Sequence, residues 1–120
     1  MRGYEDVTGP HARARAFRTD LVRYLNSRGI KAVDLAARGI DLAGRFAVAT
    51  SVRSHGGSAG FRADKLADDL ERVGQAQSNA ATMAIIRAPF STQPSEQWCV
   101  VPLALFADLL LAAADASDDA

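Results

Sequence analysis

The spacing of the apolar residues changes at Gly29, and this change restricts the folds that the chain can adopt. Across residues 11–28, apolar side chains recur every three or four positions, which indicates an amphipathic helix. Gly29 then supplies the residue that a left-handed helix end prefers. Beyond it the pattern breaks into three short pieces separated by residues 38–39 and 44–45. The sequence therefore predicts one helix followed by a three-stranded antiparallel meander.

The second half of the chain alternates between helical and strand-like patterns. Residues 64–79 predict a second helix with an acidic exposed face, and the unbroken apolar run at 82–88 is typical of a strand covered on both faces. Residues 98–101 predict a last strand. Pro102 then occupies the preferred first position of a final helix that should end near residue 116. The predicted class is α/β (α+β) with a mixed sheet, in the order helix, three strands, helix, strand, strand, helix.

With 120 residues, the chain has room for one domain. We place it at residues 11–116, between a mobile N-terminus at 1–10 and an acidic tail at 117–120. The Gly- and Ser-rich stretch at 54–60 is interpreted as a connector, because it lacks the Gly-Lys-Ser/Thr ending of a phosphate-binding loop.

Charge is balanced overall but divided between the halves. Residues 1–62 hold eleven basic and five acidic side chains, whereas residues 63–120 hold three basic and nine acidic ones. The balance argues against a uniformly basic nucleic-acid coat. Apolar runs fall short of signal-peptide or membrane-spanning length, so we expect a soluble protein without membrane contact. We expect Cys99 to be a small buried hydrophobic residue. It is the single cysteine of the sequence, so it can form neither an intrachain disulfide nor, with the two histidines, a four-ligand zinc site.

Several local sequences have the same order as motifs of a known nuclease family. They are Phe17-Arg18, Tyr24-Leu25 and Gly29 in the first helix, Ile40-Asp41-Leu42-Ala43-Gly44 in the meander, and residues 83–87 and 95–101 in the second half. Together they resemble the PD-(D/E)XK superfamily, and within it the Holliday-junction resolvase-type endonucleases of actinobacterial phages, over about residues 15–112. The resemblance implies a restriction-endonuclease-like αβββαβ core, followed by a C-terminal strand and helix.

The catalytic positions of that family are mostly lost. The family places a Glu on the first helix, an Asp after the turn, a Glu on the next strand and a Lys two residues later. Ungapped spacing puts these positions at Arg18, Asp41, Ala49 and Ser51, so only Asp41 keeps the required type. Because Mg²⁺ needs several oxygen ligands, we expect an inactive nuclease fold with no catalytic residue, metal or cofactor. In the alternative, an active Mg²⁺-dependent junction endonuclease rebuilds its site from Arg53, Asp64, Lys65, Asp68 and Glu71.

The final helix suggests what an inactive fold could do. Its large apolar residues cover more than one face, and Asp108 alone interrupts them over 103–111. Such a helix packs on its own sheet or against another chain. We predict a structural or assembly component, homo-oligomeric or docked to other phage proteins, in the host cytoplasm or an assembled phage particle, with no small-molecule substrate. Candidate contacts are Leu105, Phe106, Leu109 and Leu110. A further alternative is non-catalytic DNA binding through Arg15, Arg18, Arg23, Arg45, Arg53 and Arg62.

Overall fold

The predicted helix and meander are present in the computed structural model, which describes residues 10–51, 63–77, 81–88, 91 and 93–118. The first elements are α1 (Pro10–Ser27), β1 (Ala32–Asp34), β2 (Ile40–Leu42) and β3 (Phe46–Ser51). β1 pairs antiparallel with β2, and β2 antiparallel with β3. A short 3-10 helix, η2 (Ala36–Arg38), lies between β1 and β2 and was not predicted from the sequence.

The second half adds a crossover helix, two strands and a terminal helix. These elements are α2 (Ala63–Ala76), β4 (Ala81–Ile86), the 3-10 helix η3 (Pro94–Glu96), β5 (Trp98–Val100) and α3 (Leu103–Asp118). β4 runs parallel to β3, as expected when a helix connects them, and β5 returns antiparallel to β4. The sheet order is β1-β2-β3-β4-β5. The mixed five-stranded sheet confirms the predicted α+β class and is compatible with an αβββαβ core plus a C-terminal helix.

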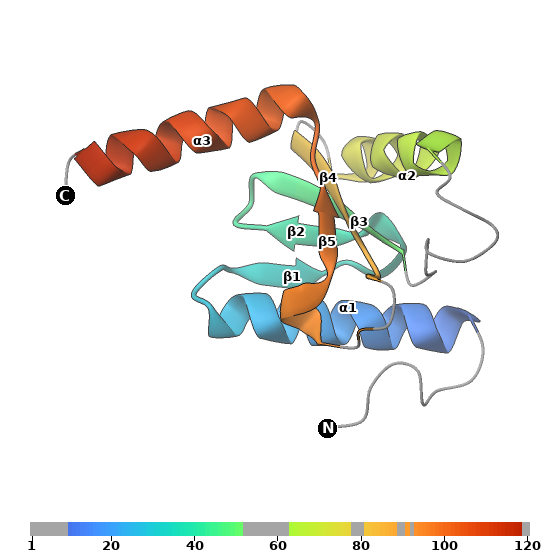
Figure 1. The fold of residues 1–120 in the computed structure, drawn as a ribbon. Coiled ribbons are helices and arrows are strands. Elements are labelled where there is room, and N and C mark those ends of the chain that lie inside the picture. The colour runs from blue at the N-terminus through green and yellow to red at the C-terminus, as the bar shows by residue number, and fades with distance from the viewer. Residues whose placement is uncertain (1–9, 52–62, 78–80, 89–90, 92, 119–120) are drawn as a thin grey trace.

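Two helices cover opposite faces of the sheet, and each face has its own core (Figure 1). On the α1 face, Phe17 and Leu21 pack with residues that include Ile40 and Val48. On the α2 face, Val73 packs on the small residues Ala47, Ala49 and Ala84. Successive residues of a strand point to opposite faces, which is why neighbouring positions of β3 belong to different cores.

Three sequence expectations differ from the structure. Cys99 is exposed rather than buried, because it lies on β5, an edge strand. Arg28, the last residue of the predicted helix at 11–28, is exposed and lies beyond the end of α1. Pro102 precedes α3 instead of beginning it, and its carbonyl accepts a hydrogen bond from the N–H of Phe106 at 3.0 Å.

Some expectations fall on parts of the chain that are not described. The connector at 54–60, nine of the ten N-terminal residues and the last two residues of the acidic tail lie outside the described ranges. The first two tail residues, 117 and 118, belong to α3. Within the described residues, no helix is long and apolar enough to cross a membrane.

Candidate functional site

The four nuclease-like positions do not converge on one point. Asp41 pairs with Ala47 across β2 and β3, so both side chains face α2. Alternation along β3 places Ala49 and Ser51 on that same face. Arg18, however, extends from α1 on the other side of the sheet. The position that the family gives to a helix carboxylate is therefore separated from Asp41 by the sheet itself.

The site of the expected strand carboxylate is filled by core packing. Ala49 is 2% exposed and packs with Val73 and Ala84 beneath α2. A carboxylate at this position would be buried among apolar atoms, where an unpaired charge is very costly.

The described residues do not bring together a replacement metal site. Among them, no three His, Cys, Asp or Glu side chains come close enough to hold a metal ion. Lys65 is paired with Asp69 at 3.3 Å, within its own helix. Asp68 and Glu71 are exposed on α2, whereas Arg53 and the side chain of Asp64 lie outside the described part of the chain.

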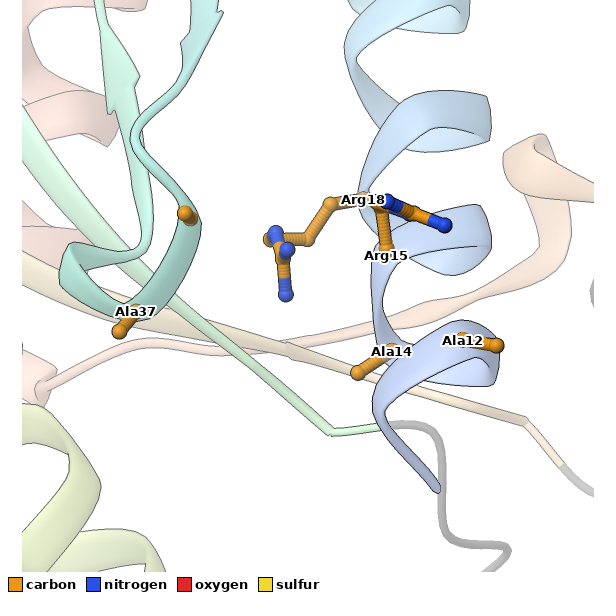
Figure 2. A pocket seen from close by; sticks show the side chains of 6 residues that line it. Ala12, Ala14, Arg15, Arg18 and Ala37 are labelled. Carbon is orange, nitrogen blue, oxygen red and sulfur yellow. The ribbon is translucent and has the colours of Figure 1, made fainter. Parts of the chain in front are cut away.

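Arg18 has a structural partner that the sequence did not reveal. Its Nε donates to Asp34 Oδ1 at 2.9 Å, and the same carboxylate oxygen accepts the N–H of Ala36 at 2.8 Å. This arrangement joins α1 to the end of β1 and fixes the start of η2. Arg18 and Arg15 line an open cavity of about 540 Å³ between α1 and η2. Figure 2 shows Arg18 reaching from α1 toward the turn that carries Ala37.

The other DNA-binding candidates are dispersed. Arg23 lines a different hollow on α1, together with Asp20 and Pro94. Arg45 is exposed in the turn between β2 and β3. Arg53 and Arg62 lie outside the described residues. Among the four candidates that the structure describes, Arg15 and Arg18 line the same cavity.

Two titratable groups, Asp20 and Cys99, have raised pKa values. Burial raises the pKa of Asp20, which is 8% exposed on α1, and the positive charge of Arg23 partly opposes this effect. Sequence reasoning missed Asp20, whose only signal was its position beside Leu21 on the buried side of α1. Cys99 is exposed as a residue, but neighbouring atoms shield its thiol from water and raise its pKa, so the protonated, less reactive form is favoured.

The most distinctive surface is α3, which extends from the end of the sheet away from the rest of the molecule (Figure 1). Leu105 is half-buried and packs against the core on the α1 face. All other residues of α3 from 103 to 116 are exposed. Leu103, Leu110 and Leu111 have exposed fractions of 80%, 54% and 65%. The exposed set is completed by Phe106 and Leu109.

The two acidic residues of α3 between 103 and 116 lie on one side of the helix. Asp108 and Asp115 are seven positions apart, which corresponds to about two helical turns. Neither Lys nor Arg occurs from residue 103 to 118. α3 is therefore an apolar helix with a narrow acidic strip.

Comparison with known proteins does not assign the chain to a family. No family model matches it, and neither the curated proteins nor the solved structures include a significant match.

Proposed function

We propose that this chain is a non-catalytic assembly protein that associates through α3. The observation that carries the proposal is the row of exposed large apolar residues on that helix, of which Leu103 is the most exposed. Monomeric proteins rarely expose apolar patches larger than a few hundred Å². Covering α3 with protein would remove this surface from water.

The geometry around Asp41 supports a role without catalysis. Metal-dependent phosphodiester hydrolysis relies on metal ions that stabilise the attacking and leaving oxygens. Asp41 is a single carboxylate, and the face it shares with Ala49 is packed beneath α2. The resemblance to phage nucleases makes a structural component of a phage the natural setting for such a protein.

Non-specific DNA contact is a second candidate, favoured by one observation. Arg15 and Arg18 line the same cavity, and guanidinium groups bind phosphate oxygens well. Arg18 already donates to Asp34, which reduces the net positive charge there. We therefore rank DNA contact below assembly.

Sedimentation of the full-length protein tests the proposal. We expect the wild type to associate as its concentration rises from low micromolar to near-millimolar. Leu110→Gln/Leu111→Gln should abolish association without loss of folding, because both side chains are exposed. Trp98→Gln is the matched control: Trp98 is 51% exposed, but it lies at the start of β5, away from α3. A monomeric wild type, or a leucine variant that associates normally, contradicts the proposal.

A nuclease assay tests the alternatives. Labelled four-way junction and duplex DNA should remain intact with Mg²⁺ or Mn²⁺. Cleavage by the wild type that Asp41→Asn abolishes would establish an active endonuclease. If DNA is bound without cleavage, affinity should fall steeply with salt and Arg15→Ala should weaken it. Binding that promotes association independently of α3 would favour the DNA-contact function.

A further inference from the structure

We propose that α3 associates with α3 of a second copy of this chain, and that the two helices pack antiparallel as a short coiled coil. The contact is made by Leu103, Phe106, Leu110 and Ala113, which we term the seam. The inference rests on the proposed assembly function, and it names the partner and the packing geometry.

The seam has the spacing of a coiled-coil contact. Phe106 follows Leu103 by three positions, Leu110 follows Phe106 by four, and Ala113 follows Leu110 by three. In a heptad repeat these are successive a and d positions, which share one side of the helix. All four side chains are exposed. The seam is therefore left open in the single copy, over the residues that the structure describes.

α3 is attached to its own copy from another side. Leu105 packs against the core on the α1 face. At about 100° per residue, it lies about 120° around the helix from the middle of the seam. Packing of α3 on its own sheet therefore does not use the seam.

The charges of α3 allow two identical helices to pair. Asp108 and Asp115 lie about 170° around the helix from the middle of the seam. Over residues 103–116, the positions of the seam and the e and g positions beside it hold only Leu, Phe and Ala. Two seams can therefore meet without like charges opposing association. A charged partner surface would lose its hydration there without gaining an opposite charge, so the seam fits an equally apolar helix.

The sizes of the seam residues select the antiparallel direction. With the two-fold axis at the level of Asp108, Phe106 lies opposite Leu110 of the second copy. In the same alignment Leu103 lies opposite Ala113, so a large side chain fills the space beside a small one. A parallel pair would instead place Ala113 against Ala113 and leave a gap between the helices.

The placement of α3 agrees with this direction. α3 leaves the sheet at its first residue and extends away from the rest of the molecule (Figure 1). An antiparallel pair places the two sheets at opposite ends of the helices. A parallel pair would place both sheets at the same end, where they compete for space.

The buried area fits a weak dimer. At on the order of 150 Å² for a large apolar residue, the exposed parts of Leu103, Phe106, Leu109 and Leu110 offer about 350 Å² per copy. Two copies bury about 700 Å² from these residues, and the exposed alanines on the same side raise the total toward the roughly 1,000 Å² of a small specific interface. We therefore expect dimerisation that depends on concentration over the micromolar range.

Two adjacent leucines test which side of α3 makes the contact. Leu110 belongs to the seam, whereas Leu111 lies about 120° from its middle, although Leu111 is the more exposed of the two at 65% against 54%. Leu110→Gln should raise the dimer dissociation constant about tenfold or more, because a buried leucine is lost from the contact. Leu111→Gln is the matched control and should raise it less than about threefold. Sedimentation equilibrium measures both constants.

Disulfide cross-linking tests the direction of the pair. Leu103→Cys and Ala113→Cys are made separately, each with Cys99→Ser to remove the native thiol, and are oxidised alone and as an equal mixture. The antiparallel pair brings position 103 of one copy beside position 113 of the other. Identical positions lie about 15 Å apart along the helices, beyond the about 7 Å between Cα atoms that a disulfide can bridge. Covalent dimer should therefore form in the mixture and not with either variant alone.

Each other outcome has a distinct meaning. Equal weakening by Leu110→Gln and Leu111→Gln overturns the seam. Covalent dimer from Leu103→Cys alone shows a parallel pair, and no covalent dimer in the mixture places α3 against another surface. Any of these results overturns the inference and leaves α3-mediated association intact. A wild type that remains monomeric rejects the proposed function itself.

Discussion

α1 and α3 are helices of similar length, but α1 buries its large apolar side chains and α3 leaves most of them exposed. α1 has 18 residues and buries Phe17 and Leu21 to 1% and 2% exposure. α3 has 16 residues and a richer supply of leucine, yet Leu103 and Leu111 remain 80% and 65% exposed. The contrast teaches that apolar content does not determine where a helix packs. A helix is buried only where a sheet face is not already covered by another helix.

Both faces of the sheet are covered by elements that precede α3 in the sequence. α1 packs against one face and α2 against the other, with Val73 fully buried over small residues of β3 and β4. β5 then delivers the chain to the end of the sheet, and only Leu105 of α3 contacts the core on the α1 face. The sheet together with α1 and α2, termed the body, therefore accounts for most of the stability of the single copy. Most of α3 remains exposed and is available for association.

The largest expected effect separates these two roles. Leu21→Ala should lower the free energy of unfolding by about 2–5 kcal/mol, because it leaves a cavity between α1 and the sheet. Leu110→Ala should change it by only about 0.5 kcal/mol in dilute protein, as is usual at exposed positions. Urea denaturation at low concentration measures both. Equal losses for the two variants would show that α3 contributes to the core of the single copy.

Close backbone packing within the body gives the next largest effect. Gly39 has φ +89°, and a Cβ placed there would lie 2.3 Å from the carbonyl oxygen of Val48. Gly39→Ala should therefore cost about 1–3 kcal/mol from overpacking, in addition to about 1–3 kcal/mol for a backbone conformation (φ +89°, ψ −156°) that glycine alone adopts readily. Denaturation with urea measures the total.

Gly29 is the matched control for this substitution. Its φ is +86°, but no atom lies within 4 Å of the Cβ position. Gly29→Ala should show only the conformational cost. If the two alanine variants were equally destabilised, the approach of Gly39 to β3 would not limit the fold.

Much of the fold could be predicted because its signals are local. The helical spacing of Phe17 and Leu21, and the change of pattern after Gly29, gave the correct element types. η2 had no such signal. Ala36 adopts φ +57° without being glycine, and η2 is held by distant partners: Arg72 donates to the Ala37 carbonyl and Gln77 to the Arg38 carbonyl.

The candidate site was predictable only in part, for a similar reason. The two-residue period of a strand accounts for Ala47 and Ala49 lying on one face of β3. The salt bridge between Arg18 and Asp34 joins residues sixteen positions apart, which no periodicity can indicate. The exposure of α3 depended on how the rest of the sheet was covered. Sequence periodicity identifies an apolar face but does not show whether a partner face remains.

Protonation of Asp20 should have a smaller effect on the free energy of unfolding, and it again distinguishes the body from α3. Burial raises the pKa of Asp20 in the folded state. Its stabilising contribution is therefore complete below the unfolded-state pKa of about 3.9 and is lost as pH rises through the folded pKa. Asp20→Asn removes this loss, so stability relative to wild type should increase from about pH 3 to about pH 7.

Urea denaturation across that pH range measures the difference. The matched control is Asp108→Asn, which makes the same substitution at an exposed position of α3. An Asp20→Asn variant that loses stability as pH rises would mean that the charged carboxylate is favoured in the fold.

The smallest effect concerns the salt bridge between Arg18 and Asp34. Its side chains are 15% and 30% exposed, so solvent screens the pair, and a double-mutant cycle should give a coupling of about 1 kcal/mol or less. Asp34→Ala should cost more than Arg18→Ala, because Asp34 also accepts the N–H of Ala36. Neither variant should alter association, since both residues lie away from the end of the sheet where α3 begins. Weakened association in Arg18→Ala would show that the body and α3 are coupled, and the division between a self-sufficient body and an associating helix would then fail.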